Sequence, residues 1–183
     1  MSAAFCVLLV GLALPQAAKA DSFGEQEARF ASGTGYDAFL IAGIVLPLLE
    51  SEEHDGEHAL RALDAIVAGD LITQALKSIT HEWRPDDSDD RSFPSGHATM
   101  AFAVATVEAE YHPKQAVLWY LGAAMIAESR VELKKHYIHD VIAGAAVGYF
   151  TAQWEIHSPR GLLIYPFIKP DDGCVGMQIV ATF

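Results

Sequence analysis

Apolar positions recur along much of this chain at the spacing of an α-helix. The clearest stripe follows an acidic segment, SEEHDGEH, at residues 51–58. Its apolar members, three or four residues apart, are Leu60, Leu63, Val67, Leu71, Ala75 and Ile79. Because residues at this spacing share one side of an α-helix, the stripe predicts a helix that buries this face against the rest of the protein.

Other apolar stretches predict further helices, after a polar lead-in at Asp21–Gly35. These helices are expected at Tyr36–Leu49, from Ser95 through Glu110, from Pro113 to about Leu133, and at His139–Trp154. The last stretch is rich in small residues, which suit close helix packing. We therefore predict an all-α fold, a bundle of about five core helices.

Beyond Pro159 the pattern changes from helical to extended. The apolar segments LLIYPFIKP and CVGMQIVATF flank Pro170-Asp171-Asp172-Gly173, a sequence typical of a tight turn. This arrangement predicts a short C-terminal β-hairpin at about residues 161–183. With a chain length of 183 residues, we expect one domain at residues 21–183, with its helical core at about 60–154.

The first twenty residues are typical of an export signal. An apolar run from Ala3 to Leu14 precedes Ala18-Lys19-Ala20, a small-x-small cleavage pattern, so residues 1–20 are expected to be a signal peptide. No Lys or Arg precedes the run, which leaves a retained membrane helix as the alternative. Cleavage would make the protein periplasmic or secreted.

The uncharged apolar runs bear on membrane association. Those at Ala38–Leu49, Ala116–Ala127 and Val141–Trp154 are about 12 to 14 residues long, shorter than the 18 or more typical of a membrane-spanning helix. This favours a soluble or peripherally attached bundle. A membrane-associated or integral envelope protein remains the alternative.

Charge restricts the partners that the protein can attract. The net charge is −12 and the isoelectric point about 4.9, while 51% of residues are hydrophobic. This negative balance argues against nucleic acid as a partner. A phosphate site in such a chain must be built locally from a few placed donors.

Two cations, Lys77 and Arg84, lie seven residues apart and just before Pro85. Seven residues is about two helical turns, so both side chains can project from one side of a helix end toward a single anion. The alternative is that both are solvated cations that compensate the partial negative charge of a helix C-terminus.

The tetrapeptide Pro94-Ser95-Gly96-His97 is suited to holding an anion. A helix N-terminus presents unpaired N–H groups, Gly96 allows close approach, and the Ser95 hydroxyl adds a donor. His97 can transfer a proton near neutral pH. A helix-capping serine beside an incidental histidine is the alternative.

A third group is Arg130 with His136 and Asp140. A carboxylate four residues after a histidine lies on the same helical face and can accept its Nδ1–H, which leaves Nε2 as a nucleophile. Arg130 adds a planar donor for phosphate oxygens. Alone, the histidine and aspartate could also be an ordinary surface pair.

Together the groups read K-x6-R-P, P-S-G-H and S-R-x5-H-x3-D. This pattern resembles the signature of the type 2 phosphatidic acid phosphatase (PAP2) superfamily, which includes class A acid phosphatases and vanadium haloperoxidases. The resemblance covers about Leu60–Trp154 and agrees with the helical bundle of that family.

The resemblance implies a role for each signature residue. The phosphate oxygens would be bound by Lys77, Arg84, Ser95, Gly96 and Arg130. His136 would attack phosphorus to form a phosphohistidine, with Asp140 orienting its ring. His97 would protonate the leaving oxygen and then activate water. The protein cations would replace a metal, so no metal or cofactor is implied.

The expected function is therefore a metal-independent phosphatase for phosphomonoesters or diphosphates, lipid phosphates among them. Two alternatives are a vanadate-dependent haloperoxidase, although the chain is short for one, and a non-catalytic phosphate-binding envelope protein. The acidic loop DDSDD at residues 86–90 is expected to be solvated or paired with Arg91, and His139 could compete with His136 for Asp140.

Overall fold

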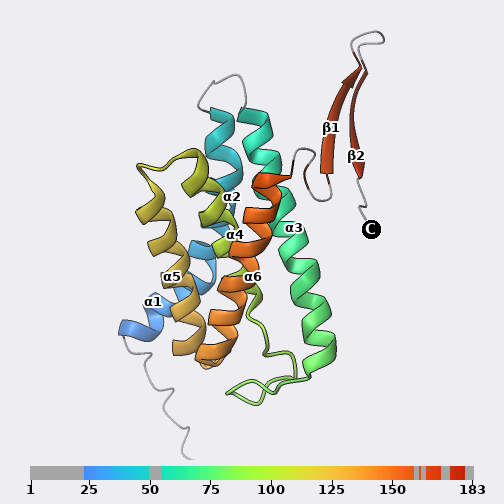
Figure 1. The fold of residues 1–183 in the computed structure, drawn as a ribbon. Coiled ribbons are helices and arrows are strands. Elements are labelled where there is room, and N and C mark those ends of the chain that lie inside the picture. The colour runs from blue at the N-terminus through green and yellow to red at the C-terminus, as the bar shows by residue number, and fades with distance from the viewer. Residues whose placement is uncertain (1–22, 50–54, 159–160, 162–163, 170–173, 180–183) are drawn as a thin grey trace, which may run out of the picture.

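The computed structural model describes residues 23–49, 55–158, 161, 164–169 and 174–179. The helices described are α1 (Phe23–Ser32), α2 (Thr34–Leu49), α3 (Asp55–Thr80), α4 (Gly96–Tyr111), α5 (Ala116–Glu132) and α6 (Ile138–His157). They form a bundle (Figure 1), so the predicted all-α architecture is confirmed. The sequence missed α1, because its apolar positions are few and the stretch reads as a polar lead-in.

Helix α4 lies at the centre of the bundle and is packed by α2, α3, α5 and α6. Its contact with α6 depends on two glycines. A Cβ atom on Gly144 would lie 2.4 Å from the Ser95 carbonyl oxygen, and one on Gly148 would lie 2.1 Å from that of Thr99. Any side chain there would force the helices apart, so the small residues of α6 hold the start of α4 in place.

The apolar stripe of α3 does not bury its face as the sequence predicted. Leu71 is 57% exposed and Ile79 75% exposed, whereas the alanines on the opposite side, such as Ala62 and Ala65, are fully buried. The periodicity located the apolar face correctly but could not say whether protein or another medium covers it. Small residues form the contact with the bundle because they allow close backbone approach.

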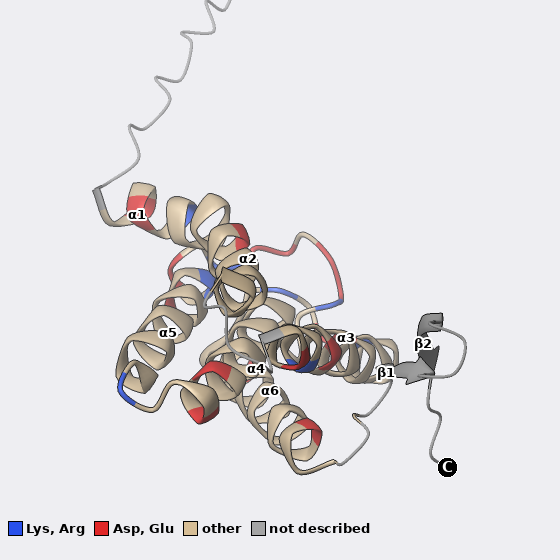
Figure 2. Ribbon diagram, turned by 90° about the horizontal axis from the view of Figure 1, so that it is seen from above, with Lys and Arg blue, Asp and Glu red and all other residues tan. Residues whose placement is uncertain are grey.

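Large apolar side chains cover much of the outside of the bundle. Exposed examples on the other helices are Ile41, Leu49, Leu118, Met125, Ile142, Phe150 and Trp154. Figure 2 shows mostly uncharged helices and a red, acidic stretch in the loop between α3 and α4. Among the described residues, Gly24–Leu49 is long and apolar enough to cross a membrane, although a single such stretch near the N-terminus carries little weight by itself.

The C-terminal segment contains two antiparallel strands, β1 (Ile164–Lys169) and β2 (Cys174–Ile179). Ile164 pairs with Ile179 and Lys169 with Cys174. The strands lie where the sequence predicts a hairpin and stand to one side of the bundle (Figure 1). The predicted signal peptide at residues 1–20 and the turn at 170–173 lie outside the described residues.

Candidate active site

The predicted site residues come together at one end of the bundle. Helix α3 ends there, α4 begins there, and α5 and α6 are joined there by a short turn (Figure 1). Lys77 comes from the last turn of α3, Arg84 from the loop that follows, and His136 from the turn between α5 and α6. Segments far apart in the sequence therefore supply one cluster.

His136 and Asp140 are buried and adjacent. The His136 Nδ1 atom lies 3.4 Å from Asp140 Oδ2, and the two side chains are 3% and 0% exposed. Asp140 Oδ2 also accepts hydrogen bonds from the Ser92 hydroxyl at 2.5 Å and from the Tyr137 N–H at 2.9 Å. These donors fix the carboxylate, which in turn faces the histidine ring.

The contact with Arg84 shows which ring nitrogen of His136 carries no hydrogen. Arg84 Nη1 lies 3.2 Å from His136 Nε2. Because a guanidinium can only donate, Nε2 must be the acceptor and the proton of the neutral ring must sit on Nδ1. The lone pair of His136 therefore points toward the cationic side of the site. Arg84 is itself held by Asp89, whose Oδ1 accepts from Nε at 2.7 Å.

Ser95 immediately precedes α4. Its backbone N–H donates to the Asp140 carbonyl oxygen at 3.0 Å. The fully buried Oγ makes no hydrogen bond within the described residues, so it does not cap α4 as the sequence suggested. A Cβ on Gly96 would meet Thr73 Cγ2 only at 3.8 Å, an ordinary contact. Protein packing therefore does not demand a glycine here, which leaves room for a ligand.

Arg130 and His97 lie beside the junction of α1 and α2. An Arg130 Nη1 donates to the Ser32 hydroxyl, while its buried Nε has no hydrogen-bond partner among the described residues. The His97 ring stacks on Tyr36 with centroids 4.2 Å apart. Ser32 and Tyr36 precede the signature motifs, so no pattern in the sequence indicated either contact.

Lys77 completes the set of cations, although its ammonium group is turned toward backbone oxygens. Its Nζ donates to the carbonyl oxygens of Arg91 and Ser92, at 2.5 and 3.0 Å. The side chain is buried, at 6% exposure for the residue. The contact ties the end of α3 to the loop that carries Ser92.

Both histidines are held neutral by their surroundings. Burial, followed by the charges of Arg84, Lys77 and Arg130, lowers the pKa of His136 to about 3. Burial and the charge of Arg130 lower the pKa of His97 to about 4. An anion bound among these cations would offset their charge and raise both pKa values. The site thus combines a neutral nucleophilic nitrogen with an excess of positive charge.

The acidic loop is more than a solvated segment. Asp86 pairs with Lys135, and Asp89 binds Arg84 and accepts from the Arg91 N–H at 2.9 Å. The Arg91 guanidinium donates a hydrogen bond to Gln74 Oε1. Arg91 therefore pairs with the acidic loop through its backbone N–H and not through its side chain. The loop carboxylates therefore orient cations at the site, a role that composition alone could not indicate.

His139 does not displace His136 from Asp140. Its Nε2 lies 3.2 Å from Asp140 Oδ1, whereas His136 faces Oδ2. The two histidines thus use different oxygens of one carboxylate.

The fold and the cluster define a class of protein. The sequence pattern of the PAP2 superfamily matches residues 58–162, and the chain belongs to this superfamily. This match includes the predicted phosphate-binding and catalytic residues and excludes α1 and α2.

Known proteins of related sequence are membrane or lipid proteins by name. A lipid A 1-phosphatase of Porphyromonas gingivalis is 32% identical over 109 residues, which cover 54% of this chain and 24% of that protein. The bacitracin transport permease protein BcrC of Bacillus licheniformis is 26% identical over 125 residues, 62% of each chain. The chain thus spans less than two thirds of the length of either relative.

Two solved structures share the fold. LpxE of Aquifex aeolicus superposes with a TM-score of 0.60 at 23% identity, covering 74% of this chain and 84% of the other. A transmembrane PAP2-type phosphatidylglycerolphosphate phosphatase of Bacillus subtilis gives a TM-score of 0.55 at 20% identity, with 72% of each chain covered.

Proposed function

We propose that the protein is a metal-independent phosphatase that hydrolyses lipid phosphomonoesters or diphosphates through a phosphohistidine at His136. The observation that carries this proposal is the position of His136 Nε2, which lies 3.2 Å from Arg84 Nη1 with its lone pair toward that nitrogen. The buried Ser95 Oγ and Arg130 Nε, which lack hydrogen-bond partners among the described residues, support an oxyanion ligand at the same place.

In the proposed reaction, the phosphate oxygens are bound by the residues with spare donors and by the cations around them. These are Lys77, Arg84, Ser95, the Gly96 N–H and Arg130. Such donors stabilise the charge that spreads over the equatorial oxygens in the transition state. His136 Nε2 attacks phosphorus, so an N–P bond forms as the bond from phosphorus to the leaving oxygen breaks.

His97 supplies the proton for the leaving oxygen. In the empty site its pKa is about 4, because of burial and the charge of Arg130. A bound phosphate dianion offsets that charge and raises the pKa, so binding of substrate favours the protonated ring. After the alcohol departs, the neutral His97 accepts a proton from water, whose oxygen attacks phosphorus and releases His136.

A lipid substrate is supported by the apolar surroundings of the site. A cavity of about 860 Å³ lies between α1, α2 and α5 and is lined by Phe30, Phe39, Met125 and Ile126, together with glutamates of α1 and α5. It reaches Ser129, the neighbour of Arg130. Relatives named lipid A 1-phosphatase act on a lipid by name, which agrees with such a substrate.

We also propose that the protein is membrane-associated. Four of the exposed apolar side chains are those of Leu71, Ile79, Phe150 and Trp154. In a membrane these side chains would contact apolar acyl chains instead of water. This proposal takes up the membrane-associated alternative, whereas the short uncharged apolar runs in the sequence favoured a soluble or peripherally attached bundle. Retention in the membrane fraction after a high-salt wash would support the proposal, and release into the soluble fraction would contradict it.

The decisive experiment measures phosphate release from a lipid phosphate in detergent micelles and from an aryl phosphomonoester, both in excess EDTA. We expect turnover by the parent, none by His136→Ala, and normal turnover by His157→Ala, an exposed histidine at the far end of α6. A radiolabelled phosphoenzyme that is labile to acid and stable to base should form in the parent. Turnover by His136→Ala would exclude this nucleophile, and phosphate binding without turnover in the parent would favour a binding protein.

A further inference from the structure

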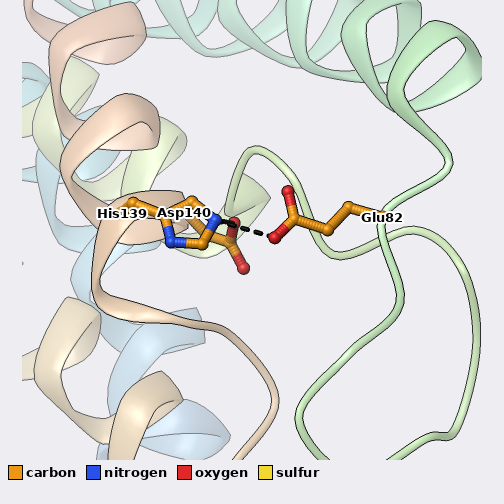
Figure 3. A group of neighbouring side chains, drawn as sticks. All are labelled: Glu82, His139 and Asp140. Carbon is orange, nitrogen blue, oxygen red and sulfur yellow. Dashed lines mark hydrogen bonds and ion pairs between the residues drawn. The ribbon is translucent and has the colours of Figure 1, made fainter.

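Three side chains, one of them that of Asp140 itself, converge on one point. Glu82 comes from the loop after α3, and His139 and Asp140 from the first turn of α6 (Figure 3). His139 Nε2 lies 2.7 Å from Glu82 Oε1 and 3.2 Å from Asp140 Oδ1. One ligand atom from each residue lies within 4.8 Å of the other two.

The ring of His139 is held in this orientation by aromatic neighbours. Its centroid lies 5.4 Å from that of Tyr137, with an interplanar angle of 8°, and 6.1 Å from that of Phe93. A ring that stacks on its neighbours loses less entropy when its nitrogen binds a ligand.

The two carboxylate oxygens of this group face a single donor nitrogen, Nε2 of His139. Asp140 Oδ1 is fully buried and accepts no hydrogen bond from the described residues. The Nε2 atom of His139 carries at most one hydrogen, and Glu82 Oε1 is the nearer acceptor. A divalent cation in the place of that one hydrogen would satisfy both carboxylate oxygens and the ring nitrogen together.

We propose that Glu82, His139 and Asp140 form a binding site for a divalent transition-metal ion of the Zn²⁺ class. One imidazole nitrogen and two carboxylate oxygens are ligands that Zn²⁺ accepts, at about 2.0–2.2 Å, with water in the fourth position. The site is open to the ion from solvent, because the side chains of His139 and Glu82 are 58% and 33% exposed. The ion takes no part in the phosphatase reaction proposed above.

Occupation of the site would inhibit the enzyme, a consequence that rests on the proposed function. Asp140 is shared, since its Oδ1 faces the metal site while its Oδ2 faces His136 Nδ1. A cation at Oδ1 draws negative charge away from the carboxylate. The carboxylate then presents less negative charge to His136 Nδ1, 3.4 Å away, and His136 Nε2 becomes a poorer nucleophile.

Binding is tested by calorimetric titration of the EDTA-stripped full chain in detergent with Zn²⁺ alone. We expect one site in the parent, and a loss of affinity of at least about tenfold in Glu82→Gln and in His139→Asn. His81→Asn is the matched control, because His81 is also exposed and paired with a carboxylate, Asp90 at 3.0 Å, but belongs to no group of three ligands in the described part of the chain. Co²⁺ should give a visible absorption band in the parent that both site variants lose.

Inhibition is measured as the ratio of turnover with Zn²⁺ to turnover in EDTA for each variant. This ratio should fall in the parent and in His81→Asn and stay near one in the two site variants. Absence of Zn²⁺ binding in the parent, or equal binding in all four proteins, would overturn the site. A parent without turnover in EDTA would refute the proposed function, while the calorimetry would still decide whether the metal binds.

Discussion

Two arginines at opposite ends of the bundle show how a structural charge differs from one available for a ligand. Arg61, near the start of α3, donates to the Glu155 and Ser158 carbonyl oxygens at 2.7 and 3.2 Å and to Glu57 Oε1 at 2.8 Å. Its Nε also donates to Glu57, so every nitrogen of the guanidinium is engaged. Arg130 donates to Ser32, while its buried Nε lacks a hydrogen-bond partner among the described residues.

The difference separates stability from function. A guanidinium such as that of Arg61, whose three nitrogens all donate to protein atoms, stabilises the fold. A buried guanidinium with a spare donor has a desolvation cost that the protein alone does not repay, which is expected where a ligand completes the set. The same contrast holds between serines, because Ser92 Oγ has a carboxylate partner and Ser95 Oγ has none within the described residues.

The largest expected effect is on stability, at the fully engaged arginine. Arg61→Met removes a cationic partner of Glu155, whose side chain is 1% exposed, and should lower the free energy of unfolding by about 3–5 kcal/mol. Thermal or denaturant unfolding in detergent measures this, and kcat/KM of the folded fraction should stay at the parental value.

The double variant Arg61→Met/Glu155→Leu tests the cause. Because it removes the buried carboxylate along with this cationic partner, most of the lost stability should return. A double variant as unstable as the single one would show that packing of the arginine stem, rather than charge, dominates.

The second effect is on catalysis, at the arginine with a spare donor. Arg130→Lys keeps the charge but loses the planar fork, and we expect kcat/KM to fall by about 10²–10³ with little change in melting temperature. Arg61→Lys is the matched control and should retain activity. Near-parental turnover in Arg130→Lys would contradict a bidentate role for Arg130.

The sequence predicted the motif residues because their chemistry depends on local spacing. His136 and Asp140 do lie together, although His136 stands in the turn before α6, which begins at Ile138, and so the two residues do not share a helical face. The contacts of Ser92, Asp89 and Ser32 depend on how loops and helices meet, and no local pattern encodes that. The α3 stripe was misread for a related reason, since a period of 3.6 identifies a face but not what covers it.

A smaller effect is expected at Ser92, which holds Asp140 in place. Loss of its hydrogen bond to the carboxylate in Ser92→Ala should lower kcat by about tenfold or somewhat more, with KM nearly unchanged. Ser88→Ala is the control, because the Ser88 hydroxyl also donates to an aspartate, Asp86, but at an exposed position. An increase in KM alone would place Ser92 in substrate binding instead of positioning.

The smallest effect concerns the dependence of stability on pH. Burial and nearby cations lower the pKa of His136 to about 3 and that of His97 to about 4, below the value of about 6.5 expected in the unfolded chain. Between pH 6.5 and 4 the unfolded state therefore binds more protons than the folded state, so stability must fall as the pH falls.

We expect the melting temperature to decrease by at least about 2–4 °C between pH 7 and 5. The decrease should shrink in His97→Asn and in His136→Asn, and stay the same in His157→Asn. Inorganic phosphate should also reduce it, because an anion among Lys77, Arg84 and Arg130 raises both histidine pKa values. If neither the histidine variants nor phosphate altered the decrease in melting temperature, the decrease would arise from other titratable groups. The two histidines would then not be held neutral by the cations around them.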